Sequence, residues 1–332
     1  MAENFLTDYG LLMDLSQKFG PSGNEKEVRD FIKDQISSVV DAIDTDTLGN
    51  LIAHKKGKGL KIMIACHMDE VGVIITHIDE QGYLYFAPVG GLKNTDLLGK
   101  RVAFRNNRIG IVCKEPVRVG KNTTDKIYID IGVTGESEAR KEVGEGDMAV
   151  LVGSFVETDS CLISKALDNR LGCFLAIELL KKVRCEHELF FAFTCQEEVG
   201  ARGAKTAAYS IRPDLALIID TTRSYDSPPE RKQPSLGQGV AIKAMDRSII
   251  VSPKIKNWMA NIAYQKKIAY QWEVITTGST DAGPIHLTGG GIPTGGIALP
   301  LKNLHTGNEI AAKTDITAAF KLLRELILNP LA

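Results

Sequence analysis

The chain has 332 residues, 44% of them hydrophobic and 24% charged, so it is long enough to bury a full globular core and a smaller second unit. A formal net charge of -1, without any basic stripe, argues against nucleic acid or an anionic membrane surface as a partner. Residues 1–10 hold acids and no long apolar core, and no apolar run reaches the length of a membrane span, so we expect a cytoplasmic protein without a signal peptide.

Two helices and three short strands are predicted before residue 70. Apolar residues at helical spacing predict a helix over 11–19, which the breakers at 20–23 end, and a second, amphipathic helix over 28–36. The period then changes, and 41–47, 51–54 and 61–65 are typical of strands. The third strand leads directly into Cys66-His67-Met68-Asp69-Glu70, so an apolar strand ends in potential metal ligands.

Residues 71–159 differ in pattern from the rest of the chain. Short β-like runs at 71–77, 83–88, 101–104, 109–112, 127–131 and 148–152 are separated by glycines and polar turns, with helical spacing only near 136–142. This spacing predicts a small β-barrel or sandwich inserted into a host domain. We therefore divide the chain into a catalytic domain, 1–70 with 160–332, and an inserted β-rich domain, 71–159.

Acidic side chains stand at one end of each apolar element in the next part of the chain. A buried helix is predicted to open at 166–170, with Asp168 at its N-terminus, where a capping carboxylate is the alternative interpretation. The apolar run 189–193 ends at Glu197 and Glu198, and 215–219 ends at Asp220. Two adjacent carboxylates at the end of a buried strand favour a cation opposite them, although a solvated pair is also possible.

The last third alternates loops, strands and helices. We predict a polar loop over 221–239, a helix over 253–267, strands near 272–275 and 297–299, and a closing helix over 315–328. His305 follows the last of these strands. The whole pattern predicts an α/β fold, with a mixed sheet sandwiched by helices and a small inserted β domain.

Potential ligands follow successive strands or open a helix: His67, Asp168, Glu197, Glu198, Asp220 and His305. Ligands of open α/β sheets gather outside the carboxyl ends of the strands, so these side chains can converge. Imidazoles and carboxylates without thiolates suit zinc, cobalt or manganese in a hydrolytic site. A carboxylate bridging two ions is the arrangement of dinuclear hydrolases.

Six motifs in order carry a family resemblance: H-M-D-E-V-G at 67–72, A-L-D-N-R at 166–170, Q-E-E-V-G-A-R-G-A at 196–204, I-I-D at 218–220, T-D-A-G at 280–283 and the late His305. Together they resemble the glutamyl-aminopeptidase and cellulase-M-like family of tetrahedral metallo-aminopeptidases. The resemblance covers essentially the whole chain and implies a zinc-exopeptidase-like fold.

The resemblance also implies a role for each site residue. Asp168 would bridge two divalent metal ions, which we expect to be zinc, with cobalt or manganese as alternatives. His67 and Asp220 would complete the shell of one ion, and Glu198 and His305 that of the other. Glu197 would be the general base that takes a proton from the metal-bound water. Asp69 would hold and orient an imidazole ligand without binding an ion itself.

The implied function is removal of N-terminal residues from short peptides by a homo-oligomer, in which dimers assemble into a tetrahedral dodecamer through the inserted domain. Two alternatives stay open: a metal-dependent deacylase or amidohydrolase acting on small acylated substrates, and an inactive structural homologue. The chain departs from the family where His305-Thr306-Gly307 replaces the usual His-Ser-Pro. From that departure we expect a looser ligand loop.

Overall fold

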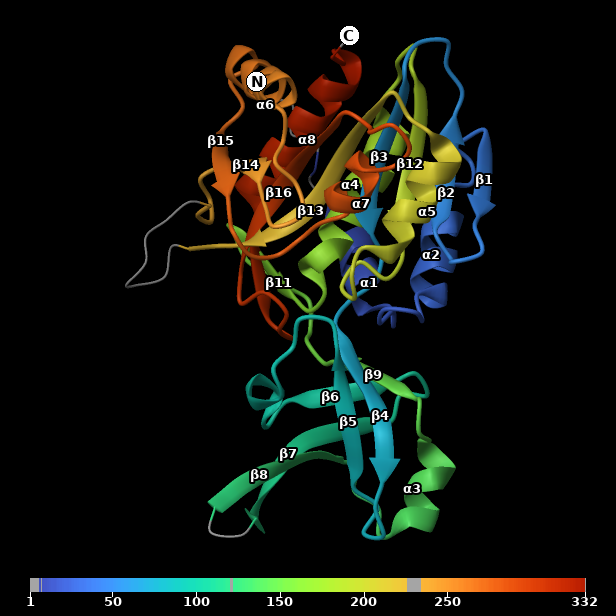
Figure 1. The fold of residues 1–332 in the computed structure, drawn as a ribbon, viewed down its shortest axis with the longest axis vertical. Helices are drawn as coiled ribbons and strands as arrows, with labels where there is room; N and C mark the ends of the chain where they lie inside the picture. The colour runs from blue at the N-terminus through green and yellow to red at the C-terminus, as the bar shows by residue number, and fades with distance from the viewer. Residues whose placement is uncertain (1–5, 7, 120–121, 226–233, 332) are drawn as a thin grey trace.

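The computed structural model describes residues 6, 8–119, 122–225 and 234–331. Figure 1 shows two parts, a large sheet covered by helices and a smaller β-barrel below it, with the first and the last helix of the chain in the sheet part. The predicted α/β fold with a mixed sheet and an inserted β-barrel is therefore confirmed.

The large sheet has 11 strands and is mixed. They are β1 (Ala42–Thr45), β2 (Leu51–Lys55), β3 (Lys61–His67), β10 (Val156–Glu157), β11 (Cys161–Ser164), β12 (Glu188–Thr194), β13 (Leu215–Arg223), β14 (Val240–Met245), β15 (Tyr270–Val274), β16 (Thr294–Lys302) and β17 (Glu309–Ala312). The main path runs β1-β2-β12-β3-β13-β16-β17-β11-β10, and β14 joins β16 and β15 off this path.

Four neighbouring strands, β12, β3, β13 and β16, are parallel and form the centre of the sheet. Their apolar runs are almost completely buried, as expected for strands covered on both faces. Because parallel strands end at the same edge, His67 at the end of β3 pairs in register with Thr194 at the end of β12. This edge carries the candidate site.

Helices cover the large sheet in two groups (Figure 1). They are α1 (Gly10–Gln17), α2 (Lys26–Ile36), α4 (Leu167–Lys182), α5 (Arg202–Ile211), α6 (Pro253–Gln265), α7 (Ala282–His286) and α8 (Lys313–Leu328). The largely buried α4 packs on β3 and β13 with α1, α2 and α8 beside it, whereas α5 and α7 pack on each other and on the central strands. Among the described residues, no helix is both long and apolar enough to cross a membrane.

The barrel is closed in the order β4-β5-β8-β7-β6-β9 and has a hydrophobic core of its own. Its elements are β4 (Gly72–Ile78), β5 (Leu84–Val89), the short 3-10 helix η1 (Asn94–Leu97), β6 (Arg101–Phe104), β7 (Ile109–Val119), β8 (Asn122–Asp130), α3 (Glu136–Glu142) and β9 (Met148–Leu151). All of them lie between residues 71 and 159, while β10 within the same range pairs with β11 of the large sheet. The domain boundaries therefore stay a prediction.

Several predicted boundaries need correction. The predicted loop 221–239 starts too early, because β13 continues through the buried Thr221 and Thr222 to Arg223; residues 226–233 of that loop lie outside the described residues. Strands β7 and β8 are longer than predicted, since they pair with each other continuously, and backbone pairing needs no apolar pattern. The sequence pattern does not predict β11, β14 or β17, which are short or interrupted by charged residues.

Candidate metal centre

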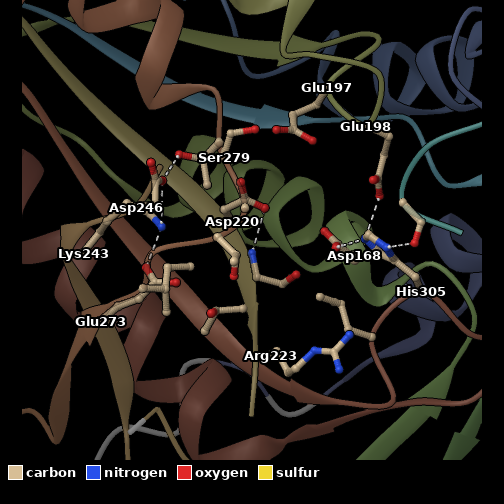
Figure 2. A pocket seen from close by; sticks show the side chains of 18 of the residues that line it. Asp168, Glu197, Glu198, Asp220, Arg223, Lys243, Asp246, Glu273, Ser279 and His305 are labelled. Atoms are coloured by element: carbon tan, nitrogen blue, oxygen red, sulfur yellow. Dashed lines mark hydrogen bonds and ion pairs between the residues drawn. The ribbon is translucent and has the colours of Figure 1, made fainter. Parts of the chain in front are cut away.

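The predicted ligands meet at the carboxyl edge of the central strands. His67 ends β3, Asp220 lies near the end of β13, and Glu198 follows β12 in the next loop. His305 follows β16, and Asp168 reaches the same edge from the first turn of α4. Residues separated by up to 238 positions in the chain thus surround one point at the edge of the sheet (Figure 2).

Asp168 contributes one carboxylate oxygen to each of two ligand groups. Its Oδ1 lies 3.3 Å from Nε2 of His67, which is also 3.5 Å from Oδ1 of Asp220. Its Oδ2 lies 3.3 Å from Nε2 of His305, which is 3.4 Å from Oε1 of Glu198. Within each group the ligand atoms lie within 4.8 Å of one another. The arrangement is that of two adjacent sites sharing one carboxylate.

The chemistry of these atoms fits two divalent cations. Oδ1 of Asp168 and Oε1 of Glu198 are buried and accept no hydrogen bond from the part of the chain that the structure describes. Leaving buried carboxylate oxygens unpaired is costly, so a cation is the partner that their environment favours. Nitrogen and oxygen donors without sulfur suit zinc, cobalt and manganese.

The excess of negative charge is visible in the protonation of the two imidazoles. Burial lowers the pKa of His305, but the charge of Glu198 and the contact with Asp168 raise it to about 12. Burial likewise opposes a charge on His67, yet its contacts with Asp168 and Asp220 raise its pKa well above the usual range. In the absence of metal ions, protons on the two imidazoles therefore offset part of the negative charge of the surrounding carboxylates.

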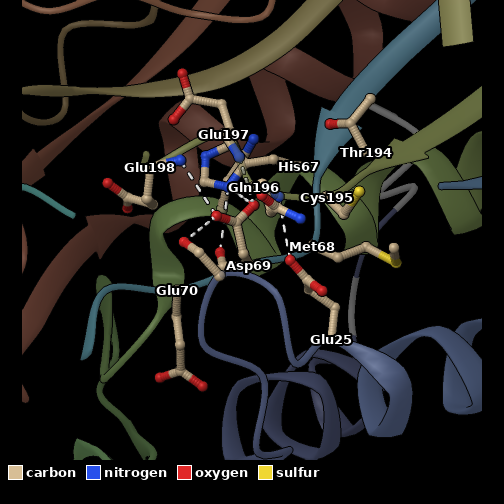
Figure 3. Close-up of polar contacts among 12 residues, drawn as sticks. Glu25, His67, Met68, Asp69, Glu70, Thr194, Cys195, Gln196, Glu197 and Glu198 are labelled. Carbon is tan, nitrogen blue, oxygen red and sulfur yellow. Dashed lines mark hydrogen bonds and ion pairs between the residues drawn. The ribbon is translucent and has the colours of Figure 1, made fainter. Parts of the chain in front are cut away.

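Asp69 connects the first imidazole to the segment after β12 (Figure 3). Its Oδ1 is 3.5 Å from Nδ1 of His67, and its backbone oxygen is 3.2 Å from the same nitrogen. The carboxylate also accepts hydrogen bonds from the backbone N–H groups of Glu197 at 2.9 Å and Glu198 at 3.1 Å, and from the hydroxyl of Ser22 at 2.6 Å. One buried carboxylate thus contacts a metal-ligand candidate and holds the backbone of Glu197 and Glu198.

Glu197 belongs to neither ligand group. Its side chain is buried, and Figure 2 shows its carboxylate pointing away from His305, whereas that of Glu198 points toward it. Burial raises the pKa of Glu197 well above its usual range, and the neighbouring carboxylates of Asp220 and Asp281 raise it further. A buried carboxylate beside a candidate metal site, with its pKa raised, is a candidate for proton transfer.

Sequence reasoning missed Glu309 at the start of β17. Its Oε2 accepts a hydrogen bond from the backbone N–H of Asp168 at 3.0 Å, and its Oε1 accepts one from that of His305 at 2.7 Å. The carbonyl of Gly91 accepts a hydrogen bond from Nδ1 of His305 at 3.1 Å. These contacts fix the two ligands through the backbone, so the only sequence signal was an acid four residues after His305.

The loop after His305 is tightly held despite its departure from the family pattern. The hydroxyl of Thr306 donates to the carbonyl of Asn303 at 2.7 Å and accepts from the backbone N–H of Asn308 at 3.1 Å. A side chain at Gly307 would lie 2.5 Å from the carbonyl of Val152, so only glycine fits this close approach. Thr306 and Gly307 thus hold the loop through contacts of their own, and the expectation of a looser loop than His-Ser-Pro gives stays a prediction.

A cavity of about 330 Å³ opens beside the ligand groups. On its far wall, Nζ of Lys243 lies 2.6 Å from Oε2 of Glu273 and 3.1 Å from Oδ2 of Asp246, and all three side chains are buried (Figure 2). Sequence reasoning also missed these residues; a lysine within the apolar run of β14 was the one available signal. The cavity therefore has a strongly polar wall opposite the ligands.

A family model described as M42 glutamyl aminopeptidase matches residues 49–322. The chain belongs to this family. It is 47% identical, over 95% of its length and 98% of the relative's, to a protein from Acetivibrio thermocellus named as a putative aminopeptidase. The suspected family resemblance is thus confirmed, and membership of the M42 family supports aminopeptidase activity.

Two solved peptidase structures agree with the fold. An aminopeptidase from Desulfurococcus kamchatkensis superposes with a TM-score of 0.90 at 35% identity, covering 96% of this chain and 94% of the other. The TET1 peptidase of Pyrococcus horikoshii, described as assembling into a tetrahedron or a large octahedral shell, gives a TM-score of 0.85 at 31% identity over 95% and 98%.

Proposed function

We propose that this M42 protein is an aminopeptidase with a dinuclear metal centre that removes N-terminal residues from short peptides. The observation that carries the proposal is the position of Asp168, whose two carboxylate oxygens each belong to a separate group of three potential ligands. In this proposal His67, Asp168 and Asp220 hold one ion, and Asp168, Glu198 and His305 hold the other.

In this proposal the metal ions and the residues around them have different chemical roles. When bound, two divalent ions supply Lewis acidity, which polarises the peptide carbonyl and makes the attacking water more acidic. Glu197 takes a proton from that water and later gives it to the nitrogen of the leaving amine, as the C–N bond of the peptide breaks. Asp69 keeps His67 and the backbone of Glu197 in place through the contacts described above.

The cavity supports a small substrate. A volume of about 330 Å³ lies at the lower end of the range for ligand pockets, roughly 300–1,000 Å³, and suits one terminal residue with its peptide bond. The polar wall of Lys243, Asp246 and Glu273 supports contacts with polar groups of that residue. The mechanism needs no protein nucleophile, because water attacks directly.

The assembly of the protein is part of the same proposal. The assembly described for the P. horikoshii relative supports a homo-oligomer here, for which we propose dimers that form a tetrahedral dodecamer. The inserted domain, residues 71–159, would contribute to these contacts. The cytoplasmic location expected from the sequence stays a prediction.

The proposal is tested by measuring metal content and hydrolysis on the same sample. We expect close to two ions per chain and release of arylamine from aminoacyl-arylamides, with activity lost on chelation and restored by zinc, cobalt or manganese. The matched control substrate carries an N-acetyl group on the same amino acid. Hydrolysis of only the acetylated substrate would indicate a deacylase, and no ion after reconstitution would overturn the dinuclear centre.

A further inference from the structure

The segment after β12 is held by a row of hydrogen bonds to carboxylates from other parts of the chain (Figure 3). Three successive backbone N–H groups take part. Gln196 donates to Oε1 of Glu25 at 3.1 Å, while Glu197 and Glu198 donate to Oδ1 and Oδ2 of Asp69 at 2.9 and 3.1 Å. Every one of these backbone groups is therefore paired with a buried carboxylate.

Glu25 comes from the N-terminal part of the chain, just before α2. Its side chain is only 4% exposed, and its Oε1 also accepts a hydrogen bond from the backbone N–H of Gly23 at 2.6 Å. The same turn provides Ser22, whose hydroxyl donates to Asp69 at 2.6 Å. The turn at 22–25 thus contacts the base-bearing segment directly, through Glu25, and indirectly, through Asp69.

The backbone at Gln196 explains why this segment needs an anchor. Gln196 has a φ of 55°, in the left-handed region that non-glycine residues rarely adopt. This conformation turns the chain out of β12, so that Glu197 and Glu198 follow at the edge of the cavity. A strained residue persists only where its surroundings hold it, and Glu25 accepts the hydrogen bond from its N–H group.

We propose that Glu25 is a positioning residue of the reaction, which holds Gln196 in its left-handed conformation and thereby aims the carboxylate of Glu197. The kinetic part of this inference rests on the proposed function. Within the described part of the chain, Glu25 forms no hydrogen bond or ion pair with His67, Asp168, Glu198, Asp220 or His305, so its effect on the ions is separable from its effect on the base.

Two variants of Glu25 and one control test the proposal. Glu25→Ala removes the acceptor for two backbone N–H groups, and we expect kcat to fall about 10- to 100-fold while KM and the metal content stay unchanged. Glu25→Gln keeps an acceptor oxygen and should restore kcat to within about threefold of the wild type. The matched control is Asp315→Ala on α8, which also removes a buried acceptor of two backbone N–H groups, those of Gly237 and Gly239. It should leave kcat unchanged.

Amide hydrogen exchange provides a readout that does not depend on turnover. In Glu25→Ala, the amides of a peptide covering 194–200 should exchange at least about tenfold faster than in the wild type. In Glu25→Gln, the same peptide should exchange nearly as in the wild type. In Asp315→Ala, its exchange should not change. Unchanged exchange and kcat in Glu25→Ala would overturn the inference, as would equal losses in Glu25→Gln. Absence of any wild-type hydrolysis would instead refute the proposed function, and exchange would still decide whether Glu25 anchors the segment.

Discussion

Two buried clusters of charged side chains draw residues from the same two segments, 67–70 and 165–170, and their charges are balanced in different ways. In the first, Asp168, Glu198 and Asp220 surround two imidazoles, and some carboxylate oxygens have no hydrogen-bond partner among the described residues. In the second, Glu70 lies 2.7 Å from Nζ of Lys165 and 3.2 Å from Nη2 of Arg170.

The second cluster is complete without any ligand. Arg170 is fully buried, and its remaining N–H groups donate to the backbone carbonyls of Met68 at 2.8 Å, Leu15 at 2.6 Å and Lys18 at 3.1 Å. Arg170 thus joins α1 and the loop after β3 to α4. The two clusters therefore differ in what balances their charge. The carboxylate of the second is paired with cationic side chains of the protein, whereas the first leaves acidic oxygens beside a cavity without a hydrogen-bond partner in the described part of the chain, as expected of a candidate cation site.

The largest expected effect comes from the carboxylate shared by the two ligand groups. Asp168→Asn keeps the size of the side chain but weakens both sites, so we expect loss of both ions and a fall in activity to the level of the chelated wild type. Metal analysis and arylamide hydrolysis on one sample check this. Full activity with two ions bound would show that the first cluster does not need this charge.

A smaller loss is expected from the carboxylate that lies outside both ligand groups. Glu197→Gln should reduce kcat by roughly 10²–10⁴-fold, the usual range for a general base, while two ions remain bound. The metal content separates this variant from Asp168→Asn. A parallel loss of ions would instead make Glu197 a ligand.

The structural cluster should respond in stability rather than in metal binding. Glu70→Ala leaves Lys165 and Arg170 buried without their carboxylate, which destabilises a protein by about 3–5 kcal/mol. Urea unfolding at a fixed protein concentration measures the change. The folded fraction at low urea should still bind two ions; loss of ions at full folding would mean that the two clusters are not independent.

Part of the fold and of the candidate site can be predicted from the sequence. The continuous apolar runs of β3, β12 and β13 predicted buried strands, and the polar residues directly after them predicted the edge where His67 and Asp220 lie. The confirmed family and fold followed from that order of motifs. The roles of the individual site residues stay predictions until metal and kinetics are measured.

The residues that sequence reasoning missed act through the backbone. Glu25 and Glu309 bind N–H groups, and every residue except proline has such a group, so no partner side chain marks the contact in the sequence. Lys243 and Glu273 are neighbours only because β14 and β15 pair in register, a pairing between strands 30 positions apart. Local patterns do not determine such pairings.

The smallest expected effect is a dependence of metal affinity on pH. The pKa of His305 is raised to about 12 and that of His67 well above its usual range, so in the metal-free protein both imidazoles carry a proton at pH 7. A metal ion binds only the neutral imidazole, so binding must release these protons, and affinity should rise with pH by up to about tenfold per unit for each proton released. The direction follows because both pKa values are raised, so each imidazole keeps its proton to a higher pH than a free imidazole does, and raising the pH helps metal ions displace that proton.

Calorimetric titration of the metal-free protein in two buffers of different ionisation enthalpy counts the protons. We expect about two per chain in the wild type and about one fewer in His305→Gln. His54→Gln is the matched control, because His54 pairs with Glu188 at 2.9 Å, away from the ligand groups, and it should match the wild type. Identical heats in both buffers would mean that the imidazoles are already neutral. The first cluster would then lack the negative excess that distinguishes it from the cluster around Glu70.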